Sequence, residues 1–363
     1  MLGRVAVPDK VIIIGGLPRS GKTILSGALG SHSQIAIPES ALNFFHYFGD
    51  EDYRSRGGFE ENLDFFFESC RKSKSWRLTR SMVTGSGDSQ KDLYLTLLET
   101  FRQAHFPDKK YFGEYTHMSE DNFDRLVGWF GPDRIKFLQV IRNPYDNYAS
   151  WVTARKMDRS LRESQSYKSP VHLFCNDWAR SAAMGMARTV RYPDSYRTLF
   201  FDQIKDDPVG FVESLCEWLD VPAEVEPMLN MVDQKKRHNT TFQIEGDMGS
   251  GVGYVRKDSY DRRKHLNEDE LSVIGAMACP DLLAAMGYTR DGGAIDWKRL
   301  KTVRLGEYSS KLRLMARSYL SPLSTSQAAL VYMSGVLEGP KVLLSRAIGK
   351  LVPNSFRRSR DRN

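Results

Sequence analysis

An apolar run that leads directly into a glycine-rich loop most constrains what this chain can fold into. Residues 11–14 read Val-Ile-Ile-Ile, and Gly16-Leu-Pro-Arg-Ser-Gly-Lys-Thr23 fits the pattern G-x-x-x-x-G-K-[ST]. The apolar run predicts a buried strand, and we expect a helix from about Lys22 to Gly30 after the loop. In such a unit the loop N–H groups and the helix N-terminus point at one anion. The sequence therefore predicts an α/β fold that binds a phosphate or sulfate group.

The loop side chains are suited to an anionic ligand. Arg19 and Lys22 can neutralise phosphate oxygens, and Thr23 offers a hydroxyl. Enzymes that use this loop on Mg·ATP or Mg·GTP also need an Asp at the end of a second apolar strand. Asp202, after Leu199-Phe-Phe, is the candidate for that Asp. A phosphate-loop kinase or NTPase is therefore one interpretation.

Short apolar runs and helical stretches alternate along the rest of the chain, which favours a parallel β-sheet flanked by helices. Residues 40–110 are rich in aromatic residues and helical only in parts. Capping residues predict helix starts at Asn143-Pro144, at Pro208 and at Asn267 with Glu270. The further predicted strands are Gln34–Ile37, Ile135–Ile141 and Arg197–Phe201.

A second anion contact is predicted where the clearest strand ends. Arg142 follows Ile135–Ile141, and Ser150 lies eight residues further on, two turns into the next helix. The carboxyl ends of parallel strands face the ligand crevice of such a sheet. Arg142 could therefore bind a second phosphate while Ser150 hydrogen-bonds it, although an ordinary surface Arg and an exposed helix Ser fit the pattern as well.

Six segments follow one another in an order that is more specific than any of them alone. They are Gly16–Thr23, Ser31–Glu39, Gly113–His117, Lys136–Ser150, Thr198–Pro222 and Leu271–Tyr288. Together they resemble the sulfotransferase superfamily, whose members use 3′-phosphoadenosine-5′-phosphosulfate (PAPS). The resemblance covers about residues 8–290 and implies the sulfotransferase fold, with no metal.

The resemblance implies a role for each donor-site residue. Arg142 and Ser150 would hold the 3′-phosphate. Arg256 and Lys257, in the polar stretch 235–265, would close over it, with Arg262, Arg263 and Lys264 competing for that role. The loop residues that would hold the 5′-phosphosulfate are Pro18, Arg19, Ser20, Gly21, Lys22 and Thr23.

The catalytic residues implied by the resemblance are Glu39, Arg19 and Lys22. Glu39, which follows Pro38, would act as the base for the acceptor hydroxyl, with His46 and His117 as alternatives. A helix-start Glu that stabilises its own helix is the ordinary alternative.

The chain departs from the family pattern at three positions. Lys22 replaces the usual Thr or Ser, Tyr115 stands where Lys is common, and Asp202 follows Phe where Tyr-Glu-Asp is usual.

Cysteine spacing and hydropathy exclude other classes. The four cysteines are widely spread, without a C-x-x-C pair or a His at ligand spacing, so we expect reduced, mostly buried thiols and no metal site. No apolar run reaches the roughly 18 residues of a membrane span, and the N-terminus lacks a signal-peptide layout. We therefore expect a cytoplasmic protein.

The positive charge lies in the tail. Fourteen basic against three acidic residues give residues 297–363 a net charge of +11; the whole chain carries +7, which leaves −4 for residues 1–296. We predict a domain at 1–290 and a basic, partly amphipathic extension at 291–363. That extension could bind an anionic membrane surface, form a dimer contact or remain a solvated helix.

Three functions remain open from the residues. They are PAPS-dependent transfer to a hydroxyl, with a carbohydrate or glycolipid acceptor favoured, a magnesium-dependent kinase or NTPase, and a non-enzymatic membrane- or nucleic-acid-binding adaptor. The chain lacks the interleaved aromatic and basic residues of a single-strand groove, so no nucleic-acid partner is expected.

Overall fold

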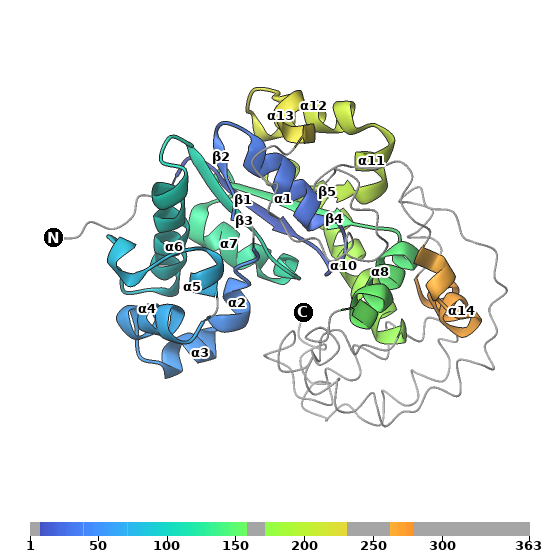
Figure 1. Ribbon diagram of the computed structural model, residues 1–363, viewed down its shortest axis with the longest axis horizontal. Coiled ribbons are helices and arrows are strands. Elements are labelled where there is room, and N and C mark those ends of the chain that lie inside the picture. Colours follow the sequence, from blue (N-terminus) through green and yellow to red (C-terminus); the bar gives the residue numbers. More distant parts are fainter. Residues whose placement is uncertain (1–7, 39, 71, 158–170, 231–261, 279–363) are drawn as a thin grey trace, which may run out of the picture. The chain divides into compact units, whose positions relative to one another are not determined.

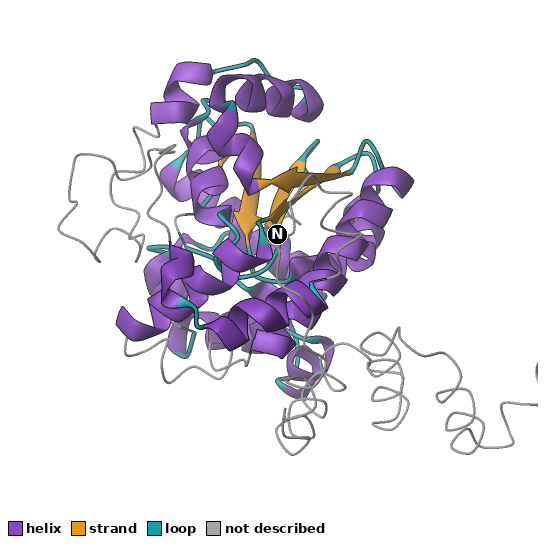
Figure 2. Cartoon of the chain, turned by 90° about the vertical axis from the view of Figure 1, so that its right-hand side faces the viewer, coloured by secondary structure: helices purple, strands orange, loops and turns teal. Residues whose placement is uncertain are grey.

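Five parallel strands form one sheet with helices on both sides (Figures 1 and 2). In this computed structural model the described residues are 8–38, 40–70, 72–157, 171–230 and 262–278. The sheet order is β2-β3-β1-β4-β5. The strands are β1 (Val11–Gly15), β2 (Ile35–Ala36), β3 (Tyr111–Tyr115), β4 (Ile135–Ile141) and β5 (Tyr196–Phe200). The α/β architecture predicted from the sequence is confirmed.

The glycine-rich loop leaves the sheet at its centre. β1 pairs with β3 on one side and with β4 on the other, with Ile14 opposite Tyr115 and Gly15 opposite Gln139. From β1 the chain crosses to β2, beyond β3, whereas β4 and β5 extend the sheet in the other direction. Ligands of open α/β sheets bind at such a reversal, outside the carboxyl ends of the strands.

Two hydrophobic cores cover the two faces of the sheet. Alternate residues of β1 divide between them, since Val11 and Ile13 belong to one core and Ile12 and Ile14 to the other. The second core is covered by α1 (Lys22–Ser31), α11 (Phe201–Asp206), α12 (Pro208–Leu219) and α13 (Val225–Asn230). The face with Ile13 is covered by α6 (Gln90–His105), α7 (Phe123–Phe130) and α10 (Val171–Arg191).

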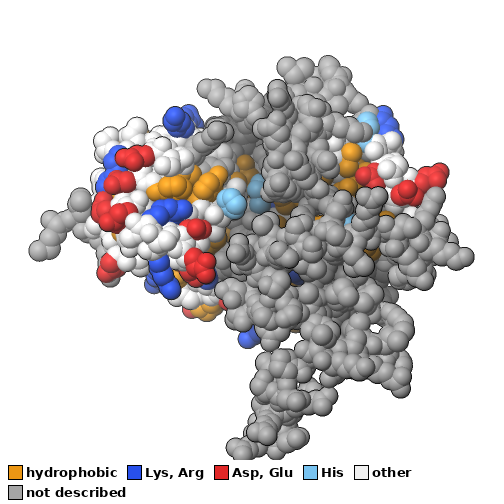
Figure 3. All heavy atoms as spheres, turned by 90° about the horizontal axis from the view of Figure 1, so that it is seen from below, with side chains coloured by type: hydrophobic (Ala, Val, Ile, Leu, Met, Phe, Trp, Pro, Cys, Tyr) orange, Lys and Arg blue, Asp and Glu red, His pale blue; other side chains and the backbone are white. Residues whose placement is uncertain are grey.

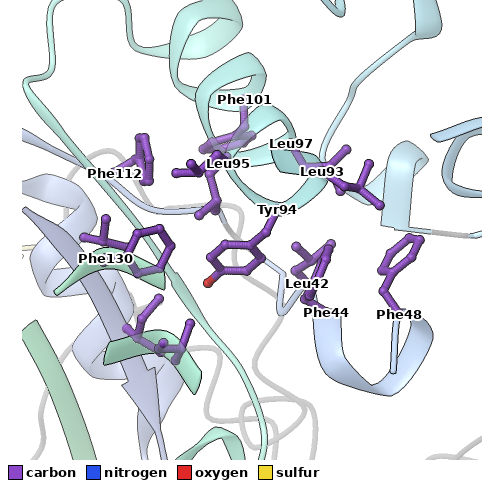
Figure 4. Close-up of a cluster of buried hydrophobic side chains, with 14 of the residues drawn as sticks. Leu42, Phe44, Phe48, Leu93, Tyr94, Leu95, Leu97, Phe101, Phe112 and Phe130 are labelled. Carbon is purple, nitrogen blue, oxygen red and sulfur yellow. The ribbon is translucent and has the colours of Figure 1, made fainter. Parts of the chain in front are cut away.

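An aromatic cluster occupies the region that the sequence left only partly assigned. Tyr94 of α6 lies among Leu42, Phe44, Phe48 and Phe130 in Figure 4 and donates to buried Glu114 at 2.7 Å. Burial and Glu114 raise the pKa of the Tyr94 hydroxyl well above its usual value. Short helices complete the region: α2 (Phe44–Tyr47), α3 (Asp50–Ser55), α4 (Phe59–Glu68), α5 (Lys72–Ser75) and the 3-10 turn η1 (Arg80–Met82).

Charges of both signs are interspersed over these helices, on the left of Figure 3. Arg80 pairs with Glu60 at 2.6 Å, and Arg125 of α7 pairs with Asp50 at 2.7 Å. This surface therefore presents no large field of one sign.

A third core joins α8 (Pro144–Met157), α10 and α14 (Glu268–Met277). The predicted helix starts are confirmed: Asn143 Oδ1 accepts the Tyr145 N–H at 3.0 Å, and Asn267 and Glu270 form a capping box. Between α13 and α14 the described chain contains the 3-10 turn η6 (Arg262–His265).

Several predictions fall outside the described residues, namely Glu39, Arg256, Lys257, the domain boundary near 290 and the basic tail. Three of the four cysteines are described, and all three are buried thiols that form no disulfide. In the described part of the chain, no helix combines the length and apolar character of a membrane span.

Candidate functional site

The glycine-rich loop connects β1 to α1 through residues with positive φ. Gly16 has φ 116°, Arg19 φ 67° and Gly21 φ 109°. Residues in the left-handed region turn successive N–H groups toward a common point, which makes a concave anion site. The α1 helix starts at Lys22 with no acidic residue in its first turn, so its N-terminus stays positive.

Gly21 leaves no room for a side chain. A Cβ at this position would lie 2.2 Å from the Phe201 ring, and φ is unfavourable for other residues. We expect Gly21→Ala to lower the free energy of unfolding by about 2 kcal/mol or more. Gly128→Ala is the matched control: it lies in α7 with nothing within 4 Å of a Cβ, so it should stabilise the protein slightly. Urea unfolding measures both, and equal stabilities would contradict the packing argument.

Lys22 lies inside the loop and is only 3% exposed. Its Nζ donates to Gly16 O at 2.8 Å and also to Leu17 O. Burial lowers the pKa of Lys22 to about 7; Glu120 acts in the opposite direction, and Arg19 lowers it further. The ammonium therefore holds the loop together from within and is close to losing its proton at neutral pH.

The structure brings the two predicted anion-binding segments together, although about 120 residues separate them in the sequence. Arg19 Nε lies 3.2 Å from Ser150 Oγ, and Arg142 Nη1 lies 3.4 Å from Arg19 O. The Arg142 guanidinium stacks over the Phe201 ring at 4.8 Å. Ser150 and Arg142 thus both lie against the loop at Arg19, on the side of α8.

Two side chains of α8 also fix the loop backbone. Asn147 Nδ2 and Trp151 Nε1 both donate to Pro18 O, at 3.4 Å and 2.8 Å. Trp178 of α10 donates to Arg142 O at 2.8 Å, which anchors the end of β4. Hydrogen bonds therefore tie the loop to α8 and the end of β4 to α10.

The end of β3 joins the loop to the aromatic region. Asn43 Oδ1 accepts the Thr116 hydroxyl at 3.0 Å and the His117 N–H at 3.2 Å. The Met118 N–H in turn donates to Gly16 O at 3.1 Å. His117 is exposed beside this connection, and His46 is exposed on α2.

Other candidates lie away from these contacts. Arg263 pairs with Asp146 of α8 at 2.9 Å, and Lys264 is exposed. Asp202 stands in the first turn of α11 rather than at the end of β5, which ends at Phe200, one residue earlier than predicted. Across the described ranges, no group of three or more His, Cys, Asp or Glu side chains could hold a metal ion.

Sequence reasoning missed several residues that contact the loop, namely Glu120, Asn147 and Trp151. Asn147 and Trp151 stand four and eight positions after Asn143, so helical spacing places them on the face that carries Ser150 or close to it. No local sequence pattern could have identified Glu120, because its contact with Gly16 depends on the pairing of β1 with β3.

The sequence of this chain also matches a known protein family. The sequence model of the sulfotransferase family matches residues 11–225, more than half of the chain. The chain belongs to the sulfotransferase family. No curated protein matches it significantly. Membership favours sulfotransferase chemistry over the kinase or NTPase and over the adaptor.

Solved sulfotransferase structures are similar over most of the chain. One from Alicyclobacillus acidocaldarius has 18% identity and a TM-score of 0.44, covering 78% of this chain and 98% of its own. The sulfotransferase domain of the curacin biosynthetic pathway has 17% identity and a TM-score of 0.42, with 78% and 99% coverage. The domain from the Synechococcus olefin synthase has 15% identity and a TM-score of 0.41, with 81% and 93% coverage.

Proposed function

We propose that this sulfotransferase moves a sulfuryl group from PAPS to a hydroxyl group of an acceptor. The observation that carries the proposal is the meeting of Arg19 with Ser150 and Arg142 beside an anion-binding loop. PAPS carries anionic groups at two positions, and a loop flanked by a second cationic site suits such a donor.

The residues present fit this donor. The loop from Gly16 to Gly21, with positive φ at Gly16, Arg19 and Gly21, would provide N–H groups for the 5′-phosphosulfate. Arg142 and Ser150 provide a guanidinium and a hydroxyl for the 3′-phosphate. Arg256 and Lys257, outside the described residues, remain candidates for further contacts with it.

Bound PAPS would supply an activated sulfuryl group whose leaving group is a phosphate. In-line transfer of this kind depends on positioning and on charge stabilisation. Arg19 and Lys22 would stabilise the negative charge that develops on the leaving oxygen, and the loop N–H groups would orient the donor.

The acceptor hydroxyl must lose a proton, and two residues compete to take it. We propose Glu39, whose segment follows β2 and leads into Asn43. His117 is the alternative, because Asn43 holds its backbone next to the loop. A carboxylate or an imidazole near neutral pKa suits this task.

The base is assigned by comparing Glu39→Gln with His117→Asn. We expect Glu39→Gln to abolish sulfuryl transfer in single-turnover assays and to leave binding of adenosine 3′,5′-bisphosphate (PAP) unchanged. His117→Asn should keep most of the transfer rate. The reverse pattern would assign the base to His117.

A carbohydrate or glycolipid hydroxyl is the acceptor we propose. The partly buried aromatic residues that pack on the outside of this core, among them Phe45, Tyr47 and Phe65, would form its binding region, since aromatic faces stack well on sugar rings. If the basic tail binds anionic lipid, a membrane-linked acceptor follows naturally.

Calorimetric titration with PAP tests the proposed donor. We expect tight PAP binding that persists in EDTA, and weak binding of ATP or GTP with Mg²⁺. Preference for a magnesium triphosphate would overturn the proposal and make Asp202 the next residue to replace.

A further inference from the structure

A buried carboxylate takes the first N–H of the phosphate loop. Glu120 lies in the 3-10 turn η2 (Ser119–Asn122) after β3 and is 0% exposed. Its Oε2 accepts the Gly16 N–H at 3.0 Å, and its Oε1 accepts the Ser181 hydroxyl at 2.5 Å. Burying a carboxylate is costly, so a group placed here needs a compensating role.

Further hydrogen bonds hold Ser181, which donates to this carboxylate, in place. Gln139 Nε2 donates to Ser181 O at 2.7 Å and to Ser181 Oγ at 2.8 Å. Gln139 Oε1 accepts the Tyr196 hydroxyl. Gly185 makes room for this arrangement, because a Cβ there would lie 2.2 Å from Gln139 Oε1. Side chains from β4, β5 and α10 thus determine where the Glu120 carboxylate lies.

The charges around the turn are arranged in pairs. Arg188 donates to the Glu120 backbone carbonyl and pairs with Asp124 at 3.1 Å. Arg180 pairs with Asp121 through two hydrogen bonds, of 2.6 Å and 3.2 Å. On the loop side the charged groups are Lys22 and Arg19, and Glu120 is the acidic group that favours the protonated form of Lys22.

We propose that Glu120 is a positioning residue of the phosphate loop: its carboxylate fixes the Gly16 N–H while the Lys22 ammonium holds the Gly16 carbonyl, so the two opposite charges act on the same residue. The Gly16 N–H is held by Glu120 and the Ser20 N–H donates to Leu17 O, so the anion would be bound by other N–H groups of the loop and of the α1 N-terminus. The link to PAPS rests on the proposed function, whereas the effect on the loop does not.

A carboxylate near an anion site would by itself weaken anion binding through repulsion. The Glu120 carboxylate instead aids binding because it orients the loop before the anion binds and favours the protonated form of Lys22. These two roles separate in two variants. Glu120→Gln keeps an acceptor for the Gly16 N–H and removes the charge, whereas Glu120→Ala removes both.

Hydrogen exchange of the ligand-free protein tests the positioning role. We expect the Gly16 amide to exchange roughly tenfold faster in Glu120→Ala, and several-fold faster in Ser181→Ala, than in the wild type. Glu120→Gln should retain most of the protection. Asp121→Asn is the matched control, because it removes the adjacent carboxylate, which pairs with Arg180, and should leave Gly16 exchange unchanged.

PAP affinity across pH tests the charge role. We expect Glu120→Gln to match the wild type at pH 6 and to lose about tenfold in affinity relative to it by pH 8, because Lys22 gives up its proton earlier. Glu120→Ala, which also loses the acceptor for the Gly16 N–H, should bind about tenfold more weakly already at pH 6, and its affinity should fall further toward pH 8 in parallel with that of Glu120→Gln. Asp121→Asn should stay within about threefold of the wild type throughout.

The outcomes distinguish this inference from the proposed function. Failure of the wild type to bind PAP, with Gly16 exchange still dependent on Glu120, would refute the donor and support the positioning role. A wild-type pH profile in Glu120→Gln together with wild-type exchange in Ser181→Ala would overturn the inference, even if Glu120→Ala fails to fold.

Discussion

Arg142→Ala should weaken PAP binding by roughly 30-fold to 1,000-fold, as expected when one member of a hydrogen-bonded charge pair that is desolvated in the complex is removed. Arg142 follows β4, and its Nη1 lies 3.4 Å from Arg19 O of the loop, where the proposed function puts the second phosphate of the donor. Its backbone carbonyl, which accepts the Trp178 N–H, survives the substitution. Calorimetric titration of the wild type and of Arg142→Ala with PAP measures the loss of affinity.

Arg134→Ala is the matched control for this variant. Arg134 is exposed just before the amino end of β4, one strand length away from Arg142. We expect Arg134→Ala to bind PAP as the wild type does. If both arginine variants lost affinity equally, the effect would reflect net charge rather than a site, and the assignment of Arg142 would fail.

The second large effect concerns pH. The pKa of Lys22 is about 7 without ligand, because burial disfavours the ammonium. A bound phosphate favours the ammonium, so above pH 7 binding must take up a proton. We expect the Kd for PAP to rise by up to about tenfold per pH unit between pH 7.5 and 9. The phosphates of PAP, which titrate near pH 6, stay constant over that range.

Lys22→Met removes the titrating group and serves as the comparison. We expect this variant to bind PAP weakly and with the same Kd at pH 7.5 and pH 9. Wild-type binding that is equally flat would show that Lys22 keeps its proton throughout, contrary to the effect of its burial.

The same proton affects the stability of the ligand-free protein. Lys22 has a pKa of about 7 when folded and 10.5 as a free side chain, so the unfolded chain holds more protons between these values. Stability relative to Lys22→Met should therefore rise with pH across this window, by up to about 1.4 kcal/mol per pH unit. Urea unfolding at pH 7.5, 8.5 and 9.5 measures the slope.

The sequence predicted those parts of the molecule that local patterns determine. β1, β4 and the start of α12 match their predicted positions because apolar runs and capping residues mark them directly. β3 was not predicted as a strand: its residues, Tyr-Phe-Gly-Glu-Tyr, mix a glycine and a charge. A Cβ at Gly113 would lie 2.2 Å from Ile12 O, so close pairing with β1 explains that glycine.

The residues of the candidate site likewise divide into those that local sequence patterns predict and those that they do not. The loop, Arg142 and Ser150 could be predicted because their motifs are local, and the structure places them together. Glu120 could not be predicted, since its role depends on strand pairing and on α10, which contributes Ser181 from sixty-one positions away. Donor specificity and the base remain predictions.

The chain order of the strands has a consequence for how this protein can diverge. Helices α2–α6 all enter after β2 and leave before β3, two neighbouring strands on one side of β1. The loop, Arg142 and Ser150 come instead from β1, β4 and α8. Insertions in the loops that connect these helices could therefore change the proposed acceptor region without altering the residues that we propose hold the donor. Any such change would have to keep the hydrogen bond between Asn43 and Thr116, which joins the aromatic region to the end of β3.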